Sequence, residues 1–112
     1  MLKKTFCLKL LSILSFTLIT LLPAPVSAAV IEVEIKKFKF IPQQLSVNVG
    51  DTVIWSNKEK RQYHSVWFKA AGDAEPDYFF PDETYQRTFN QAGTFNYICG
   101  PHPKMTGIIT VK

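Results

Sequence analysis

The chain has 112 residues, of which 46% are hydrophobic and 20% are charged, and its formal net charge is +4. This length allows one domain. Three of the thirteen basic residues lie within the first nine positions, so the remainder of the chain is nearly neutral. A nucleic-acid-binding protein needs a basic surface, and the composition therefore argues against a nucleic acid partner.

The first 28 residues have the pattern of a secretory signal peptide. A lysine-containing start is followed by an apolar run at residues 10–22 and then by "PAPVSAA", which supplies prolines and small residues. Cleavage is expected after Ala28, with Ala29 as the alternative, and it leaves residues 29–112 as a single exported domain. The apolar run is shorter than the roughly 20 residues of a spanning helix. The alternative to cleavage is a leader that stays in place as a membrane anchor.

The rest of the chain reads as short strands separated by turns. Alternating apolar and polar residues, and runs rich in β-branched and aromatic residues, are typical of strands. Residues 69–81 are rich in Gly, Pro, Ala and acids and are expected to form a long loop. The expected strands are 30–40, with a bulge or bend near Lys36 and Lys37, then 44–49, 52–55, 63–68, 84–89, 94–99 and 107–112. This series predicts an all-β antiparallel sandwich or barrel of about 7–8 strands.

Cysteine usage points to a particular site. Cys7 is removed with the leader, so Cys99 is the one cysteine of the exported domain. Exported compartments are oxidising, and a lone exposed thiol there needs a partner, a buried place or a metal.

Cys99, His102 and Met105 follow the spacing C-x2-H-x2-M within one short loop. Thiolate and thioether are soft ligands, and imidazole suits copper as well as zinc. A set of two histidines, one cysteine and a weak axial methionine is typical of an electron-transfer blue-copper site. His64 is the only other histidine of the chain. The predicted metal ligands are therefore His64, Cys99, His102 and Met105.

Each of these residues alone would more often be a core residue than a ligand, and their combination favours the metal. Other chemistries fit less well. A structural zinc site uses more thiolates than this domain has, and the C-x-x-C-H motif of c-type haem is absent. A Cys–His hydrolase needs a third group to orient the imidazole, and none is evident beside His102.

Four stretches resemble the cupredoxins, the type 1 blue copper proteins of the plastocyanin/azurin group, and most of all its amicyanin branch. They are "FKFIPQQLSVNVGDTVIWSN", "YHSV", "AGTFNYICGPHPKM" and "GIITVK". The resemblance implies an eight-stranded Greek-key β-sandwich (cupredoxin-like) with one copper ion at one end, held by the four residues above. It also implies that copper alternates between Cu(I) and Cu(II) in the periplasm, and that His102 presents its ring edge within an apolar patch.

The leading hypothesis is therefore a periplasmic electron carrier, not an enzyme. Its expected partners are a redox protein donor and acceptor, such as a dehydrogenase or a c-type cytochrome, which a monomer meets transiently. The alternative is a periplasmic carrier or buffer for copper delivery. Two positions depart from the resemblance: Ser65 follows the first histidine where many cupredoxins have Asn, and Tyr63 precedes it where amicyanin-like sequences often have Pro.

Overall fold

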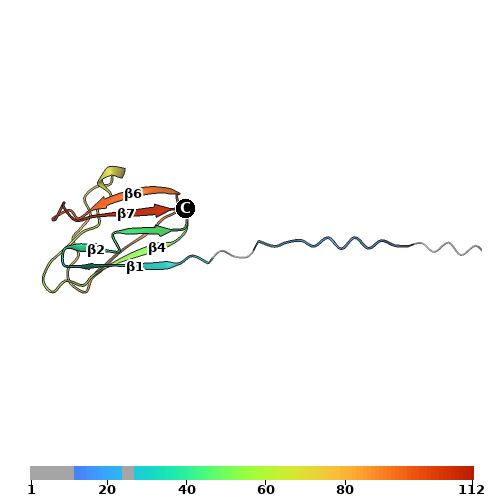
Figure 1. Ribbon diagram of the computed structural model, residues 1–112, viewed down its shortest axis with the longest axis horizontal. Coiled ribbons are helices and arrows are strands. Elements are labelled where there is room, and N and C mark those ends of the chain that lie inside the picture. The colour runs from blue at the N-terminus through green and yellow to red at the C-terminus, as the bar shows by residue number, and fades with distance from the viewer. Residues whose placement is uncertain (1–11, 24–26) are drawn as a thin grey trace, which may run out of the picture.

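The computed structural model describes residues 12–23 and 27–112. Residues 12–23 carry no strand or helix, have exposed side chains and extend away from the folded part (Figure 1). The basic start of the predicted signal peptide and part of its "PAPVSAA" end lie outside the described residues. Within the described part of the chain, no helix has the length and apolar character needed to cross a membrane.

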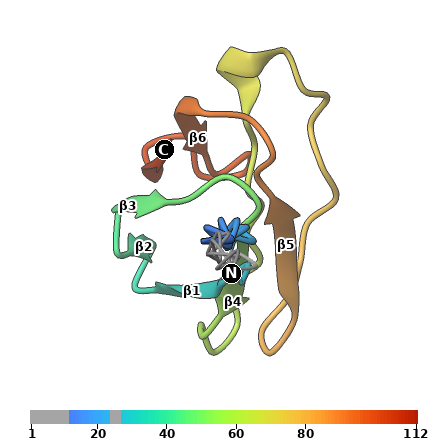
Figure 2. The same ribbon diagram turned by 90° about the vertical axis from the view of Figure 1, so that its right-hand side faces the viewer.

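Seven strands and one short 3₁₀-helix make up the folded part. They are β1 (Val30–Lys36), β2 (Lys39–Ile41), β3 (Gln44–Val47), β4 (Thr52–Asn57), η1 (Lys69–Ala71), β5 (Thr84–Thr88), β6 (Gly93–Ile98) and β7 (Thr106–Val111). One sheet has the order β2-β1-β4-β5 and the other has the order β3-β7-β6. The view along the strands shows the two sheets facing each other (Figure 2). The predicted all-β sandwich is confirmed.

The sheets are mixed, so the pairing is not antiparallel throughout as expected. β1 pairs with β4 in parallel, from Val30 opposite Thr52 to Ile35 opposite Asn57. β3 and β7 are also parallel, whereas the other three pairs are antiparallel. Parallel strands need a crossover connection, and here β2 and β3 provide it. The chain leaves the first sheet at β3 and returns to it at β4.

Two local predictions were wrong. The single strand expected at residues 30–40, with a bulge or bend near Lys36 and Lys37, is two strands joined by a tight hairpin, because Lys37 and Phe38 take left-handed backbone angles (φ 52° and 57°). Residues 63–68 do not form a strand. His64 makes an isolated bridge to Phe79, and Trp67 makes one to Ile98 at the end of β6. Aromatic content made this segment look like a strand, although it makes only these two isolated bridges.

Aromatic side chains dominate the core between the sheets. Trp55 from β4 and Tyr97 from β6 are almost fully buried, with ring centroids 5.5 Å apart. The Trp55 indole N–H donates to the Tyr97 hydroxyl (3.1 Å), so two buried polar groups satisfy each other. Burial raises the pKa of Tyr97 to about 12. Gly107 lies against the Tyr97 ring, and a Cβ at that position would overlap it.

Candidate metal centre

The loop between β6 and β7 carries three of the four predicted ligands. Cys99 directly follows β6 and Met105 directly precedes β7, where the last register pair is Ile98 opposite Thr106. The Cys99 amide donates to the Met105 carbonyl (3.0 Å), and the Met105 amide donates to the His102 carbonyl (2.9 Å). The loop is therefore closed by backbone hydrogen bonds at its base and anchored in the strand ladder.

His64 reaches the same end of the sandwich from the loop after β4. Its amide donates to the Phe79 carbonyl (3.1 Å) and its carbonyl accepts from the Phe79 amide (2.9 Å). Asn57, which is fully buried, holds this arrangement from the end of β4. Its side-chain amide donates to the carbonyls of Gln62 (2.8 Å) and Phe79 (3.1 Å).

Three predicted donor atoms converge. The Cys99 Sγ lies 3.5 Å from the His64 Nδ1 and 3.6 Å from the His102 Nδ1, and the two Nδ1 atoms are 3.2 Å apart. His64 and Cys99 are fully buried, and His102 is partly exposed.

The spacing of these donors fits a metal ion. A point equidistant from the three atoms lies about 2 Å from each, close to the roughly 2.0–2.3 Å of metal–imidazole and metal–thiolate bonds known for zinc. One thiol sulfur and two imidazole nitrogens at these separations match the composition of the trigonal His2Cys donor set that blue-copper sites use.

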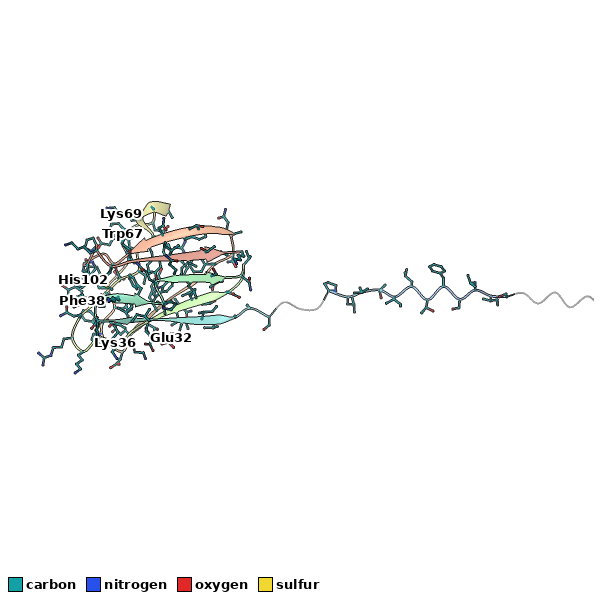
Figure 3. The ribbon with its side chains drawn as sticks, viewed as in Figure 1. Glu32, Lys36, Phe38, Trp67, Lys69 and His102 are labelled. Carbon is teal, nitrogen blue, oxygen red and sulfur yellow. The ribbon has the colours of Figure 1, made fainter. Side chains whose placement is uncertain are left out.

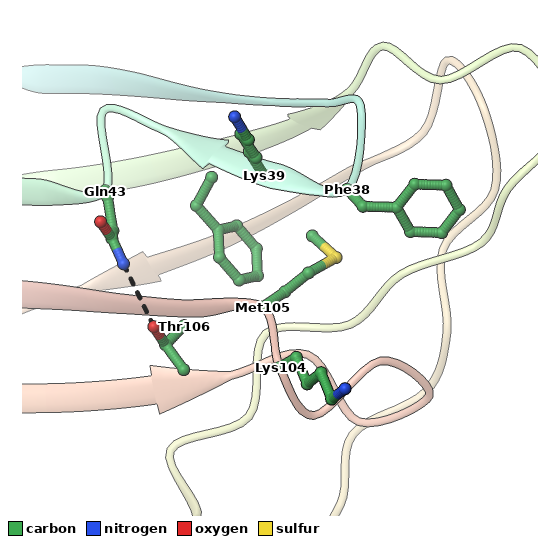
Figure 4. Close-up of a pocket in the computed structure, with 7 residues that line it drawn as sticks. Phe38, Lys39, Gln43, Lys104, Met105 and Thr106 are labelled. Atoms are coloured by element: carbon green, nitrogen blue, oxygen red, sulfur yellow. Dashed lines mark hydrogen bonds between the residues drawn. The ribbon is translucent and has the colours of Figure 1, made fainter.

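Met105 lies at the same end of the sandwich and is 6% exposed. Together with Phe38 and His102 it lines a surface hollow of mainly apolar character. In the close-up, the thioether of Met105 lies on the Phe38 side of the hydrogen bond that the Gln43 side-chain amide donates to the Thr106 hydroxyl (3.2 Å) (Figure 4). The structure thus brings all four predicted residues to one end of the fold.

Ser65 joins the two segments that carry the donors. Its amide donates to the Cys99 Sγ (3.4 Å), and its hydroxyl accepts from the Gly100 amide (2.8 Å). A Cβ on Gly100 would lie 2.8 Å from that hydroxyl, so glycine permits the close approach. The shorter side chain that stands where many cupredoxins have Asn still makes the connection between the ligand loops.

Without a metal, the surroundings of His64 and Cys99 favour the neutral forms of both side chains. Burial lowers the pKa of His64, and the neighbouring His102 lowers it further, while Glu59 acts in the opposite direction. Burial raises the pKa of the Cys99 thiol, against hydrogen bonds from Ser65 and His102. A bound metal reverses this for cysteine, because coordination deprotonates the thiol.

Two residues near the site were not identified from the sequence. The Phe38 ring stands edge-on to both imidazoles, with centroids 5.7 Å from His64 and 5.0 Å from His102. The Glu59 Oε1 lies 3.4 Å from the His64 Nε2, too poorly aligned for a hydrogen bond, and accepts from the Phe38 amide (2.8 Å). Phe38 could have been noticed because it breaks the alternation of apolar residues that begins in β1. No local signal marked Glu59.

Tyr63 also contributes to the surroundings of His102. Its ring stacks on Tyr78 (5.3 Å, 3°) and lies 6.1 Å from the His102 ring, and all three are wholly or partly exposed. Phe80 closes the cluster, 5.9 Å from Tyr63. This chain therefore carries an exposed aromatic cluster beside the site.

Comparison with known proteins agrees with this fold and site. Residues 27–112 match the family described as copper binding proteins, plastocyanin/azurin family. Amicyanin of Paracoccus denitrificans is 40% identical over 93 residues, which is 80% of this chain and 70% of that protein. Plastocyanin of Scenedesmus fuscus is 33% identical over 84 residues, covering 65% of this chain and 86% of the relative. The crystal structure of amicyanin from Paracoccus versutus superposes with a TM-score of 0.69 at 35% identity, over 80% of this chain and 86% of that one.

The chain belongs to the plastocyanin/azurin family of copper binding proteins. It is accordingly a blue copper protein, of a class that carries electrons and does not catalyse reactions, and copper is its cofactor.

Proposed function

We propose that the protein is a periplasmic single-electron carrier whose copper ion is held by His64, Cys99, His102 and Met105. The observation that carries the proposal is the convergence of one sulfur and two Nδ1 atoms at separations of 3.2–3.6 Å. Copper, when bound, supplies a one-electron couple between Cu(I) and Cu(II). The Cys99 thiolate and the imidazoles of His64 and His102 would be the strong donors that hold this ion, and the Met105 thioether would be a weak one.

The surroundings of the donors favour a site that changes little between redox states. Backbone hydrogen bonds close the Cys99–Met105 loop, and Ser65 ties it to the His64 segment. Pro101 and Pro103 restrict the backbone on both sides of His102. Donor atoms held in place from outside move little when the metal charge changes, which favours fast electron transfer.

His102 provides the exit for the electron. His64 and Cys99 are fully buried, whereas the His102 ring is partly exposed and lies among Phe38, Tyr63 and Pro103. A partner that covers this apolar rim would place its redox group close to the imidazole. The partners are a redox protein donor and a redox protein acceptor, of the dehydrogenase or c-type cytochrome kind.

Burial of the donors weighs against the alternative of copper delivery. A delivery protein passes its ion to a receiving site through exchange of ligands, which requires that the receiving ligands reach the metal. Here Cys99 and His64 are fully buried, and Met105 is nearly so. Only His102 is open to an approaching ligand.

We also propose that residues 1–28 are removed on export, with Ala29 as the new N-terminus. The Ala29 amide nitrogen lies 2.9 Å from the Asp51 carboxylate, and the Ala29 carbonyl accepts from the Thr52 amide (2.9 Å). Cleavage after Ala28 turns that amide into an ammonium group beside a carboxylate. Cleavage after Ala29 would remove both interactions. N-terminal sequencing of the protein from the periplasm tests this, and a start at Val30 or an intact leader would refute it.

The test of the function is spectroscopic and electrochemical. Processed protein is loaded with one equivalent of Cu(II), its visible spectrum is recorded, and the same sample is cycled by voltammetry. We expect an intense blue band and a reversible one-electron wave with no loss of copper over many cycles. A colourless protein would refute the copper site, and copper that leaves or transfers during cycling would favour the delivery function.

A further inference from the structure

Five exposed basic side chains lie together on one side of the metal end. Two come from the end of β1 and its turn, and three come from the loop after β4. With Glu59 and Gln62 they line a surface groove, here called the basic groove: Lys36, Lys37, Lys58, Lys60 and Arg61.

The positive charge of the basic groove is not compensated locally. Among the described residues, the ion pairs are Arg87 with Asp73 and His64 with Glu59, and neither includes a cation of the groove. Glu59 is the one acid in the lining, and its side chain is only 12% exposed. Its carboxylate is directed inward to the Phe38 amide and toward the His64 ring.

The basic groove concentrates positive charge on a domain whose overall charge is close to neutral. Residues 29–112 contain ten basic and nine acidic residues, and half of the basic ones line the groove. Five of the nine acids lie within residues 73–83, in the loop that leads to β5. With a net charge near zero, the local patch and not the whole protein sets the field that an approaching molecule meets.

The groove adjoins the proposed exit for the electron. Phe38 directly follows Lys37, and its ring lies 5.0 Å from the His102 ring. The side-chain view shows Lys36, Phe38 and His102 at the same end of the sandwich (Figure 3). A molecule seated on the groove therefore reaches over Phe38 to His102.

We propose that the basic groove docks an acidic surface of the redox partner and orients that partner over Phe38 and His102. Exposed lysine and arginine side chains on a rim mainly accelerate association and select the partner, and their effect falls with salt. The occupant is a protein whose redox group is surrounded by carboxylates. This inference rests on the proposed electron-transfer function and adds the kind of partner to it.

The experiment uses two forms of one electron acceptor. Native cytochrome c has a basic surface, and succinylation of its lysines makes it acidic while the haem stays in place. Copper-loaded, reduced protein is mixed with each form in a stopped-flow instrument at several ionic strengths. The groove variant is Lys58→Gln/Lys60→Gln, and the control is Lys69→Gln/Lys112→Gln, which removes the same charge away from the groove.

With the acidic cytochrome, we expect the groove variant to react about 3- to 10-fold more slowly than the control at low ionic strength. The difference should vanish near 1 M salt, where the Debye length is about 3 Å. With the basic cytochrome, the groove variant should react as fast as the control or faster. The blue spectrum and the reduction potential should be the same in both variants.

Two outcomes would overturn the inference. The first is equal rates for the groove and control variants with the acidic cytochrome. If the blue band and the voltammetric wave are intact in that case, the proposed electron-transfer function is still supported. Unchanged rates together with a loss of binding to phosphatidylglycerol vesicles would assign the groove to a membrane surface instead. Failure of the wild-type protein to show a blue band or a reversible wave would refute the proposed function itself.

Discussion

The interior of the sandwich and its metal end reach fixed geometry in different ways. The interior uses regular strands and packed aromatic rings, with Trp55 and Tyr97 as a hydrogen-bonded pair at its centre. The metal end uses irregular loops, whose positions depend on a few side-chain hydrogen bonds. Asn57 donates to the Gln62 and Phe79 carbonyls, and the Ser65 hydroxyl accepts from the Gly100 amide. Burial of apolar area stabilises the fold with or without metal. The convergent donors at the metal end gain stability only when a ligand fills the space between them.

This contrast predicts that substitutions in the two regions have separable effects. Those in the interior should change stability in the metal-free protein, and those at the metal end should change the spectrum and the copper affinity.

The largest expected effect is that of Cys99→Ser on the metal. The thiolate is the only strong soft donor, so the blue absorption should disappear completely and copper should bind far more weakly. Serine has a similar size, and the far-ultraviolet circular dichroism of the metal-free variant should match that of the wild-type protein. Visible titration with Cu(II) measures the first effect. A variant that keeps the intense blue band would refute the ligand assignment.

Trp55→Ala should produce the largest effect on the fold. Removal of a fully buried large aromatic costs about 3–5 kcal/mol of unfolding free energy, and here it also leaves the Tyr97 hydroxyl without its donor. Trp67→Ala is the matched control, because that indole is only half-buried. Urea unfolding of the metal-free proteins measures the difference. Equal losses for the two variants would contradict the assignment of Trp55 to the centre of the core.

The residues that the sequence proposes as donors lie together in the structure, and the proposal was possible because ligand chemistry limits the choice. One cysteine and two histidines remain after the expected cleavage, and only one combination of them with Met105 suits copper. Alternation likewise predicted β5, β6 and β7, because each has one face against the core.

Other features could not be predicted because they depend on distant residues. The parallel pairing of β1 with β4 results from the path of the chain, which no local pattern encodes. The β1–β2 turn uses left-handed angles at Lys37 and Phe38, residue types that seldom adopt them. The role of Glu59 depends on a partner five residues away, reached by a loop of irregular shape.

Ser65→Ala should have an intermediate effect, on both the stability of the protein and the properties of the metal site. It removes the acceptor of the Gly100 amide, and loss of this partly buried hydrogen bond costs about 1 kcal/mol. Because Ser65 ties the Cys99 loop to the His64 segment, the blue band should also shift and the reduction potential should change. The control is Ser56→Ala, which changes another buried serine that lies in β4. Ser65→Asn should restore the potential partly, and a potential unchanged in Ser65→Ala would show that the tie does not control the copper.

The smallest expected effect lies at the opposite end of the sandwich. The Asp51 carboxylate accepts from the amides of Ala29 (2.9 Å) and Asn48 (2.8 Å), and these hydrogen bonds hold its pKa below the usual value. A carboxyl group whose pKa is lower in the folded protein stabilises the fold above its unfolded pKa, and this contribution is lost as the pH falls through the folded value.

Asp51→Asn should therefore unfold more easily than the wild-type protein at pH 7, and the difference should shrink in acid, below about pH 4. Urea unfolding of the metal-free proteins at several pH values measures it, with Asp77→Asn at an exposed position as the control. Since Asp51 lies far along the strands from the donors, the blue band of the copper-loaded variant should stay unchanged. A shift of that band would show that the two ends of the sandwich are coupled, and the separation between fold stability and metal geometry would then fail.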